Sequence, residues 1–466
     1  MHDTAAARTD HPANLSVQQL RGSFDGRIIG PGDPGFDEAR ALFYGGFDDR
    51  PAVIIRPVDA GEVARVVTLA GEAGLELAVR GGGHSSAGHS TSNGGIVLDL
   101  ANLNRLELDP ERQTAWAEAG LTTGAYTAAV GAHGLATGFG DTGSVGLGGL
   151  TLGGGIGFLV RKWGLTIDHL LAAELVTADG RLLQVDQDHH RELFWAIRGG
   201  GGNFGVATRF QFRLHPLEQI VGGMLLLPAS AEVIAGFMAE AEAAPEELST
   251  IANVMAAPPL PMVPAERVGQ LVVMALLVYA GPPEAGQRVL DRFRALAEPI
   301  ADLLQPMPYS GMFPPEDDEY HPTVVGHTMF VDRIDHAAAT TIMEHLQASD
   351  AAMRVAQLRV LGGAMARVPA DATAFAHRHR RVMATLAAFY QGPEDKAVRQ
   401  GWVDRFAAAL PQGELGAYVN FLGDEGPARV HQAYPGPTWD RLAQVKRQYD
   451  PDNLFHRNQN IPPTAT

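Results

Sequence analysis

The chain has 466 residues, 45% of them hydrophobic and 19% charged, so it is long enough for two domains of ordinary globular composition. Its net charge of −17 argues against a nucleic-acid backbone or an anionic membrane as partner, and the absence of cysteine excludes disulfides, thiol catalysis and iron–sulfur ligation. Residues 1–16 are polar and the apolar runs are too short to span a bilayer, so we expect a soluble, cytoplasmic protein.

The first predicted elements alternate between strand and helix. Residues 52–56 are apolar and β-branched, which predicts a strand. Asp59 and Glu62 have capping-box spacing and begin a helix that Gly74 ends. Residues 75–79 predict the next strand.

A glycine-rich loop, Arg80-Gly81-Gly82-Gly83-His84, follows this second strand. Three consecutive glycines let backbone N–H groups curl around an anion with no side chain in the way. The loop lies at the carboxyl end of a strand, where α/β folds commonly place ligands. The histidine is thereby held close to whatever the loop binds.

The chain then continues through further short elements and two more glycine clusters. We predict strands at 96–100, 114–119 and 206–214, a helix at 121–132 and a β-hairpin at 170–185. Ten glycines lie within residues 138–157, too many for an ordinary helix or strand, and residues 198–205 form a third glycine-rich turn.

Two segments, 138–143 and 200–205, match the G-x-G-x-x-G spacing of a Rossmann dinucleotide site. That site requires a strand before the motif and, after it, a helix whose N-terminus meets the pyrophosphate. The first segment leads into more glycines and the second into a strand, so neither has the required context. We therefore predict a fold other than Rossmann. No set of His, Asp and Glu has convincing metal-ligand spacing.

His215-Pro216 marks a change of pattern and the predicted domain boundary. From there to about residue 415, strand-like runs at 271–279, 328–332 and 357–368 alternate with alanine-rich helical segments. This alternation predicts an α+β domain dominated by antiparallel strands.

These motifs together resemble the berberine-bridge-enzyme-like group of the vanillyl-alcohol-oxidase, or p-cresol-methylhydroxylase (PCMH), flavoproteins. The resemblance covers nearly the whole chain in order and rests on residues 80–84, 146–149, 153–157, 199–205, 453–455 and 458–460. It implies an α+β, two-domain PCMH-type FAD-binding fold. Residues 1–215, with the core at about 46–216, would form the FAD domain, residues 216–415 an antiparallel-sheet substrate domain, and residues 416–466 a segment that returns to the FAD domain.

The resemblance implies a flavin joined through its 8α-methyl group to His84, although a non-covalent contact from this histidine stays open. Thr142 stands where many members have a second, cysteinyl link, so a single link is expected. The further FAD-binding residues that the resemblance implies are Arg80, Gly81, Gly82, Gly83, Ser85, His89, Gly120, Thr142, Gly143, Ser144, Gly146, Gly148, Gly149, Gly153, Gly154, Ile156, Gly157, Gly205, Val206 and Asn458.

Tyr418 and Asn420 are predicted to share one face of a strand, because side chains two residues apart point the same way. The resemblance implies that this tyrosine borders the substrate and acts as a base; the alternative is a buried tyrosine that satisfies a hydrogen bond. Val145 matches the position where oxygen reaches the flavin, and a small residue there resembles the oxygen-reactive members; it could also simply fill apolar space.

Three residues of the second domain, His327, Met329 and Gln357, match strand positions that face the flavin and substrate in the resembled family. At each of them an ordinary core or surface role stays open.

The resemblance implies an FAD-dependent oxidase that transfers hydride from a small organic alcohol, of the kind found in secondary metabolism, to FAD, with O2 as acceptor and H2O2 as product. A carbohydrate oxidase is an alternative, disfavoured by the scarcity of aromatic residues in the second domain. A flavin-dependent oxygenase or oxidative cyclase is another, and a non-catalytic flavin-binding protein a third. The oligomeric state stays open.

Overall fold

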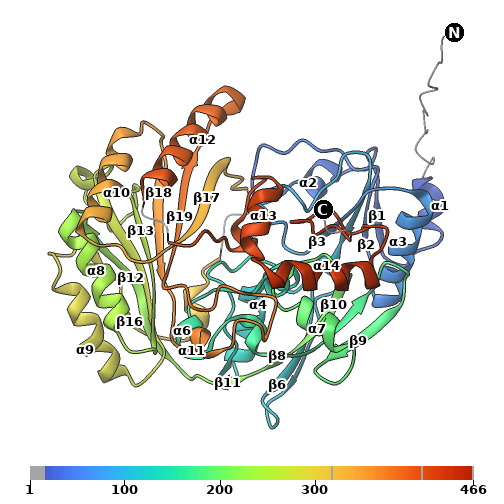
Figure 1. The fold of residues 1–466 in the computed structure, drawn as a ribbon, viewed down its shortest axis with the longest axis horizontal. Coiled ribbons are helices and arrows are strands. Elements are labelled where there is room, and N and C mark those ends of the chain that lie inside the picture. The colour runs from blue at the N-terminus through green and yellow to red at the C-terminus, as the bar shows by residue number, and fades with distance from the viewer. Residues whose placement is uncertain (1–15, 316–318, 411–412, 464–466) are drawn as a thin grey trace.

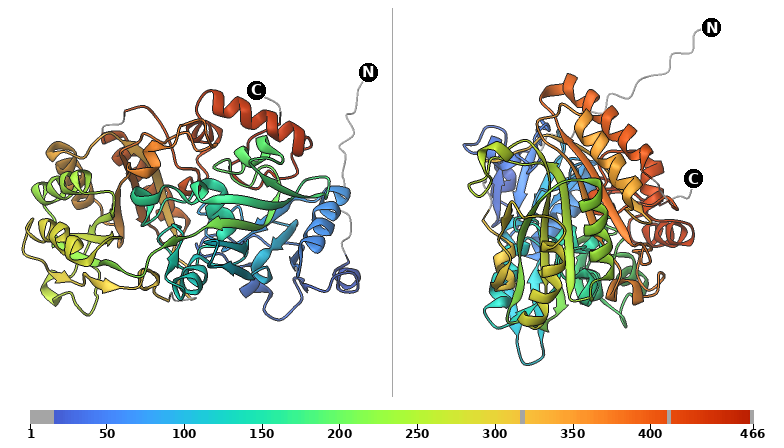
Figure 2. Two further views of the ribbon diagram at one scale, coloured as in Figure 1. Left: turned by 90° about the horizontal axis from the view of Figure 1, so that it is seen from below. Right: turned by 90° about the vertical axis from the view of Figure 1, so that its left-hand side faces the viewer.

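The computed structural model describes residues 16–315, 319–410 and 413–463, which form two layered halves lying side by side (Figures 1 and 2). The polar N-terminal stretch, residues 1–16, lies outside the described residues except for Ser16. Within the described residues, none of the helices has both the length and the apolar character needed to cross a membrane.

The first half contains a small mixed sheet in the order β1-β2-β4-β3. Strands β2 and β3 both run parallel to β4, and β1 is antiparallel to β2. The side chains of Val53, Ile54 and Ile55 are fully buried, because helices and loops cover both faces of this sheet. The strands are β1 Arg27–Ile29, β2 Val53–Arg56, β3 Leu77–Arg80 and β4 Ile96–Asp99, and the helices beside them are α1 Val17–Arg21, α2 Phe36–Arg40 and α3 Ala60–Ala73.

Helix α3 begins and ends as the sequence predicts. The Asp59 side chain accepts a hydrogen bond from the Glu62 N–H at 2.8 Å, and Gly74 ends the helix in the left-handed region at φ 62°. The capping box is only half formed, however. The Glu62 carboxylate is buried and instead accepts from the N–H groups of Asp25, Gly26 and Val58, so it fastens the preceding loops to the helix.

The second sheet of this half is antiparallel, in the order β5-β6-β10-β8-β9. The predicted hairpin is confirmed, because β8 and β9 pair from Ala172↔Asp186 to Val176↔Leu182. The strands are β5 Leu106–Asp109, β6 Thr114–Glu118, β8 Leu170–Val176, β9 Leu182–Asp186 and β10 Val206–Arg213, and the helices are α4 Thr123–Gly131, α5 Leu147–Gly153, α6 Val160–Trp163 and α7 Arg191–Ala196.

Helix α5 corrects one expectation, since it lies inside the glycine cluster that we predicted to be too glycine-rich for a helix. It is only seven residues long and contains three glycines. A Cβ atom on Gly148 would come within 3.3 Å of the Ala119 carbonyl oxygen, so this glycine allows a close approach to the neighbouring chain. Tertiary packing thus outweighs helix propensity at this point.

The second half is one antiparallel sheet in the order β15-β12-β14-β13-β18-β19-β17, with β16 paired to β12. Helices α8, α9, α10 and α12 cover its outer face (Figure 1). The strands are β12 Ile220–Pro228, β13 Leu248–Ala256, β14 Leu271–Tyr279, β15 Ala301–Asp302, β16 Gln305–Met307, β17 Val324–Val331, β18 Arg354–Val360 and β19 Val382–Phe389, and the helices are α8 Ala231–Ala243, α9 Pro283–Arg294, α10 His336–Ala348, α11 Ala364–Arg367 and α12 Gly392–Ala409.

The strand predicted at 271–279 is confirmed as β14, and that at 328–332 is the second part of a longer β17. The strand predicted at 357–368 is wrong in its second part. Strand β18 ends at Val360, because Gly362 and Gly363 adopt positive φ values of 97° and 59° and turn the chain into α11.

The chain crosses between the halves after β11 and returns near its end. Strand β11 His215–Pro216 still pairs with β7 Leu135–Ala136 of the first half, and the next strand belongs to the second. Helices α13 Pro427–Ala433 and α14 Pro437–Tyr449 return to the first half, where Leu442 and Ile461 join its core. This packing supports the proposed division at about residues 215 and 415.

Candidate active site

A cavity of about 720 Å³ lies between the two halves, within the usual volume of about 300–1,000 Å³ for sites that bind cofactors and small molecules. The glycine-rich loops and the C-terminal segment line its first part, and the inner face of the large sheet lines its second part. We call these surfaces the loop wall and the sheet wall.

The loop wall is made mainly of backbone. A Cβ atom on Gly82 would lie 2.7 Å from the Ser144 carbonyl oxygen, so the loop at 81–83 and the loop before α5 touch backbone to backbone. At Gly149 and Gly202, by contrast, an added Cβ atom would meet no protein atom within 4 Å, although both glycines line the cavity. These positions leave the backbone open to close approach by a ligand.

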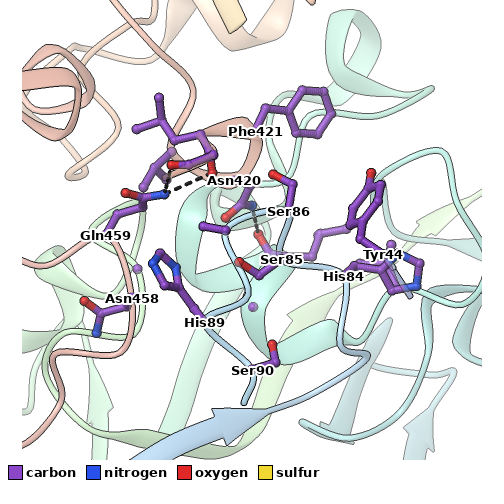
Figure 3. Close-up of a pocket in the computed structure, with 18 of the residues that line it drawn as sticks. Tyr44, His84, Ser85, Ser86, His89, Ser90, Asn420, Phe421, Asn458 and Gln459 are labelled. Carbon is purple, nitrogen blue, oxygen red and sulfur yellow. Dashed lines mark hydrogen bonds between the residues drawn. The ribbon is translucent and has the colours of Figure 1, made fainter. Parts of the chain in front are cut away.

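His84 lies on the loop wall beside Tyr44 (Figure 3). Its Nε2 atom is 2.8 Å from the Ser144 hydroxyl, and its ring stacks on Phe43 with ring centroids 4.2 Å apart. These contacts fix the orientation of the imidazole at the edge of the cavity. Thr142 and Val145 line the cavity as well.

The C-terminal segment closes the loop wall opposite Ser85 and His89 (Figure 3). The Nδ2 group of Asn458 donates to the carbonyls of Gly202 and Phe455, whereas its Oδ1 atom is buried with no hydrogen-bond partner among the described residues. Burial, assisted by the positive charge of Arg457, lowers the pKa of His89 to about 4, so this histidine is neutral at pH 7.

Tyr418 lies where the two walls meet, and the strand predicted for it is wrong. The Val419–Phe421 segment is a 3-10 helical turn, yet the predicted neighbourhood is kept, because the Asn420 Nδ2 group donates to the Tyr418 hydroxyl at 2.9 Å. The N–H groups of Gly155 and Ile156 donate to the same oxygen at 2.9 and 3.3 Å. Burial raises the pKa of Tyr418, and these three donors and the positive charge of Arg359 oppose that shift.

The glycines before Ile156 make room for this arrangement. A Cβ atom on Gly153 would overlap the Asn420 amide, and one on Gly154 would lie 3.3 Å from the Tyr418 ring. Neither glycine lines the cavity. These two glycines therefore contact Asn420 and Tyr418, and they do not line the cavity in which we expected a cofactor.

Other predicted cofactor residues also lie behind the lining. The Arg80 guanidinium donates to the carbonyls of Ala39, Arg40 and Ser90 and so joins loops beneath the cavity. A Cβ atom on Gly120 or Gly157 would overlap a backbone carbonyl, so these glycines serve chain packing. The predicted residues that do line the cavity are Gly81, Gly82, Gly83, His84, Ser85, His89, Thr142, Val145, Gly146, Gly148, Gly149, Ile156, Gly205, Val206, Gln357, Tyr418, Asn420 and Asn458, whereas Gly143 and Ser144 lie just outside.

Two of the three residues that we predicted to contact substrate, His327 and Met329, do not line the cavity, so the structure corrects these two predictions. Met329 is 1% exposed and packs in the core beneath the outer helices, so it faces away from the cavity. His327 is not a lining residue either, and its Nδ1 atom lies 3.1 Å from the Glu425 carboxylate. Only Gln357 lines the cavity. Alternation puts His327 and Met329 on the same face of β17, and the outer helices pack against that face, which the sequence pattern does not reveal.

Sequence reasoning missed Arg359, a buried cation on the sheet wall whose Nη2 group donates to the Asp141 carboxylate at 2.5 Å. The sequence did contain a signal for Arg359, because side chains two residues apart in a strand share a face and Gln357 is predicted to face the substrate. Its partner Asp141 comes from the first half, and no sequence pattern links the two.

The loop wall fits a dinucleotide cofactor. Backbone left open at Gly149 and Gly202, the unpartnered Asn458 oxygen and a cavity of about 720 Å³ are features that such a ligand would use. In the described part of the chain, no group of three or more His, Asp or Glu side chains is arranged to hold a metal ion.

Comparison with known proteins agrees with this geometry. Family models described as "FAD binding domain" and "Berberine and berberine like" match residues 51–186 and 417–462. The (R)-6-hydroxynicotine oxidase of Paenarthrobacter nicotinovorans is 31% identical over 463 residues, which cover 95% of this chain and 98% of the relative. The xylooligosaccharide oxidase of Thermothelomyces thermophilus is 27% identical over 461 residues, which cover 90% of this chain and 89% of the relative.

The solved structure of 6-hydroxy-D-nicotine oxidase from Arthrobacter nicotinovorans superposes with a TM-score of 0.84 at 28% identity, over 95% of this chain and 98% of that one. The chain therefore belongs to the berberine-bridge-enzyme-like FAD-linked oxidoreductases, and it is an enzyme. The predicted α+β fold of the PCMH type, rather than Rossmann, is confirmed.

Proposed function

Because the chain belongs to this family, we propose that it oxidises a small organic alcohol, of the kind found among secondary metabolites, at the junction of the two walls. The observation that carries the proposal is the position of the Tyr418 hydroxyl. Three N–H groups donate to it, and it lies in the cavity whose loop wall fits FAD. When bound, FAD would accept a hydride from the substrate carbon and pass two electrons to O2, which leaves as H2O2.

Tyr418 takes the proton of the substrate hydroxyl in this proposal. A tyrosine has an ordinary pKa of about 10, so it needs stabilisation of its deprotonated form to act near neutral pH. The N–H groups of Gly155, Ile156 and Asn420 point at the oxygen on which negative charge would develop. They act as an oxyanion hole does, since they are fixed before the reaction begins.

In this proposal His84 retains the cofactor. We propose that this histidine forms the single covalent link, with Ser144 and Phe43 orienting its ring. The chain contains no cysteine, so no cysteinyl link can be added. Val145, a small residue on the loop wall, leaves room for O2 beside the cofactor.

Two measurements test the proposal in sequence. An absorbance spectrum before and after acid precipitation should show flavin that stays with the precipitated protein, and His84→Ala should release it to the supernatant. Peroxide release should then be measured with a panel of alcohols, together with rapid reoxidation by air after chemical reduction. Protein that stays colourless after incubation with FAD would contradict the cofactor assignment, and flavin that no alcohol reduces would contradict the oxidase.

A further inference from the structure

The inner face of the large sheet carries a row of polar side chains across four neighbouring strands. Asn253 on β13 is directly opposite Gln357 on β18, Gln357 is opposite Thr385 on β19, and Thr385 is opposite Thr328 on β17. Residues directly opposite each other in antiparallel strands share a face of the sheet. The row therefore continues across the sheet wall.

The first members of this row satisfy one another. The Gln357 Nε2 group donates to the Asn253 side-chain oxygen at 2.9 Å, and the Gln357 Oε1 atom accepts from the Arg359 Nε and Nη2 groups at 3.0 and 2.7 Å. The Asp141 carboxylate neutralises the guanidinium. Gln357, the residue that we expected to contact substrate, is thus occupied in holding Arg359.

Three polar atoms in or next to this row are buried and lack a hydrogen-bond partner among the described residues. Two of them, the Thr385 hydroxyl and the Arg359 Nη1 group, belong to side chains that line the cavity, and the third, the Thr328 hydroxyl, does not line it. A buried polar group without a partner is unfavourable, so native proteins rarely keep one except where it serves a ligand, a water or an ion.

The next rows of the same face are apolar. Gly326, Ala387 and Val355 are opposite one another, and Val324 is opposite Phe389 beyond them; all five line the cavity. Exposed Lys396, on α12, lines the cavity too, which places the solvent side near this helix. The sheet wall thus combines one polar row with an apolar surface.

We propose that the cavity takes an amphipathic substrate, with an apolar ring or chain against Val355, Ala387 and Phe389 and a single neutral polar end on Thr385 and Arg359. A neutral end is favoured over a carboxylate because Asp141 already balances the charge of Arg359. A sugar fits poorly, since its hydroxyls would face the apolar rows without partners. This inference names the substrate class of the proposed oxidase and so rests on that proposed function.

The test is a binding measurement, which does not depend on turnover. Calorimetric titrations of the flavin-containing protein use benzamide as a neutral amphipathic probe, benzoate as an anionic one and xylobiose as a sugar. We expect benzamide to bind at least about tenfold more tightly than either of the others, since an unpaired charge or several unpaired hydroxyls oppose binding. Equal or tighter binding of xylobiose or benzoate would overturn the inference.

Thr385→Val removes the hydroxyl at nearly constant volume, and we expect it to weaken benzamide binding about five- to tenfold, the effect of one lost hydrogen bond. Thr341→Val, on α10 across the sheet, is the matched control and should leave binding unchanged. An unchanged affinity in Thr385→Val would contradict the assignment of the polar end.

Val355→Asn should weaken benzamide and strengthen xylobiose, because it places a hydrogen-bonding group in the apolar rows. If it leaves both affinities unchanged, the apolar rows do not contact the ligand and the inference fails. If benzamide binds as expected while no alcohol yields peroxide, the oxidase proposal fails, whereas the ligand preference inferred for the sheet wall stands.

Discussion

The two walls of the cavity are built in different ways. The loop wall presents backbone, at glycines whose missing side chains let loops and ligand approach closely, whereas the sheet wall presents side chains from strands in register. Glycine is required by local geometry, so the loop wall can be recognised in the sequence. The sheet wall depends on which strands pair, so its residues lie far apart in the chain.

Filling the open backbone of the loop wall should have the largest effect. The Cβ atom that Gly149→Val adds meets no atom of the packed neighbours of α5 within 4 Å, and the side chain extends into the cavity, so we expect a folded protein that binds no flavin. Gly71→Val in α3 is the matched control, because its added Cβ atom also meets nothing within 4 Å but lies outside the cavity lining. Flavin absorbance per protein and circular dichroism measure the two effects. Full flavin content in Gly149→Val would show that the cofactor does not lie against α5.

Removing Tyr418, the proposed base at the junction of the two walls, should have the second-largest effect. Tyr418→Phe should lower kcat/KM about 10²–10⁴-fold, the usual contribution of general-base catalysis, with flavin content unchanged. Because burial raises the pKa of Tyr418, the deprotonated fraction grows through the alkaline range, and wild-type kcat/KM should rise from pH 7 to pH 10. The profile of the variant should be flat. Tyr449→Phe, which removes a hydroxyl paired with His190 outside the cavity lining, should match wild type. An equal pH slope in Tyr418→Phe would exclude the tyrosine as base.

Arg378 and Asp168 form one of the ion pairs that join the two halves, and breaking it should have a smaller effect, on stability. Arg378 is fully buried and donates to both Asp168 oxygens, at 2.7 and 2.8 Å. Arg378→Met leaves Asp168 without this partner and should lower the free energy of unfolding by about 3–5 kcal/mol. Arg381→Gln, which removes an exposed ion pair with Glu242, should cost less than about 1 kcal/mol. Urea denaturation measures both, and similar losses would show that the buried pair contributes little.

The last expected effect is the pH dependence of stability, which comes from two buried histidines, His89 on the loop wall and His377 beside α13. Burial lowers the pKa of His89 on the loop wall and of His377 beside α13 to about 4, whereas both titrate near 6.5 when unfolded. The unfolded state therefore binds more protons between pH 6.5 and 4, so stability should fall in that window by up to about 1.4 kcal/mol per pH unit for each histidine. His89→Gln and His377→Gln should each reduce this slope in urea titrations; an unchanged slope would mean that the histidine is already charged when folded.

Local sequence patterns predicted the helix between Asp59 and Gly74, the hairpin at 170–185 and the glycine-rich loop at 80–84. Each of these depends on residues close together in the chain, whose capping groups, alternation or missing side chains permit few conformations. The same local information rejected the Rossmann fold, because the elements that flank each glycine motif can be read from the sequence.

The sheet wall and the surroundings of Tyr418 depend on contacts between segments that lie far apart in the chain. The packing of the outer helices against one face of β17 put Met329 in the core, and the fold brought Asp141 to Arg359 across 218 positions of sequence. The N–H groups of Gly155 and Ile156 reached Tyr418 from more than 260 positions away. A shift of one residue reverses the face of every side chain in a strand, and contacts between distant segments depend on packing that no local pattern encodes.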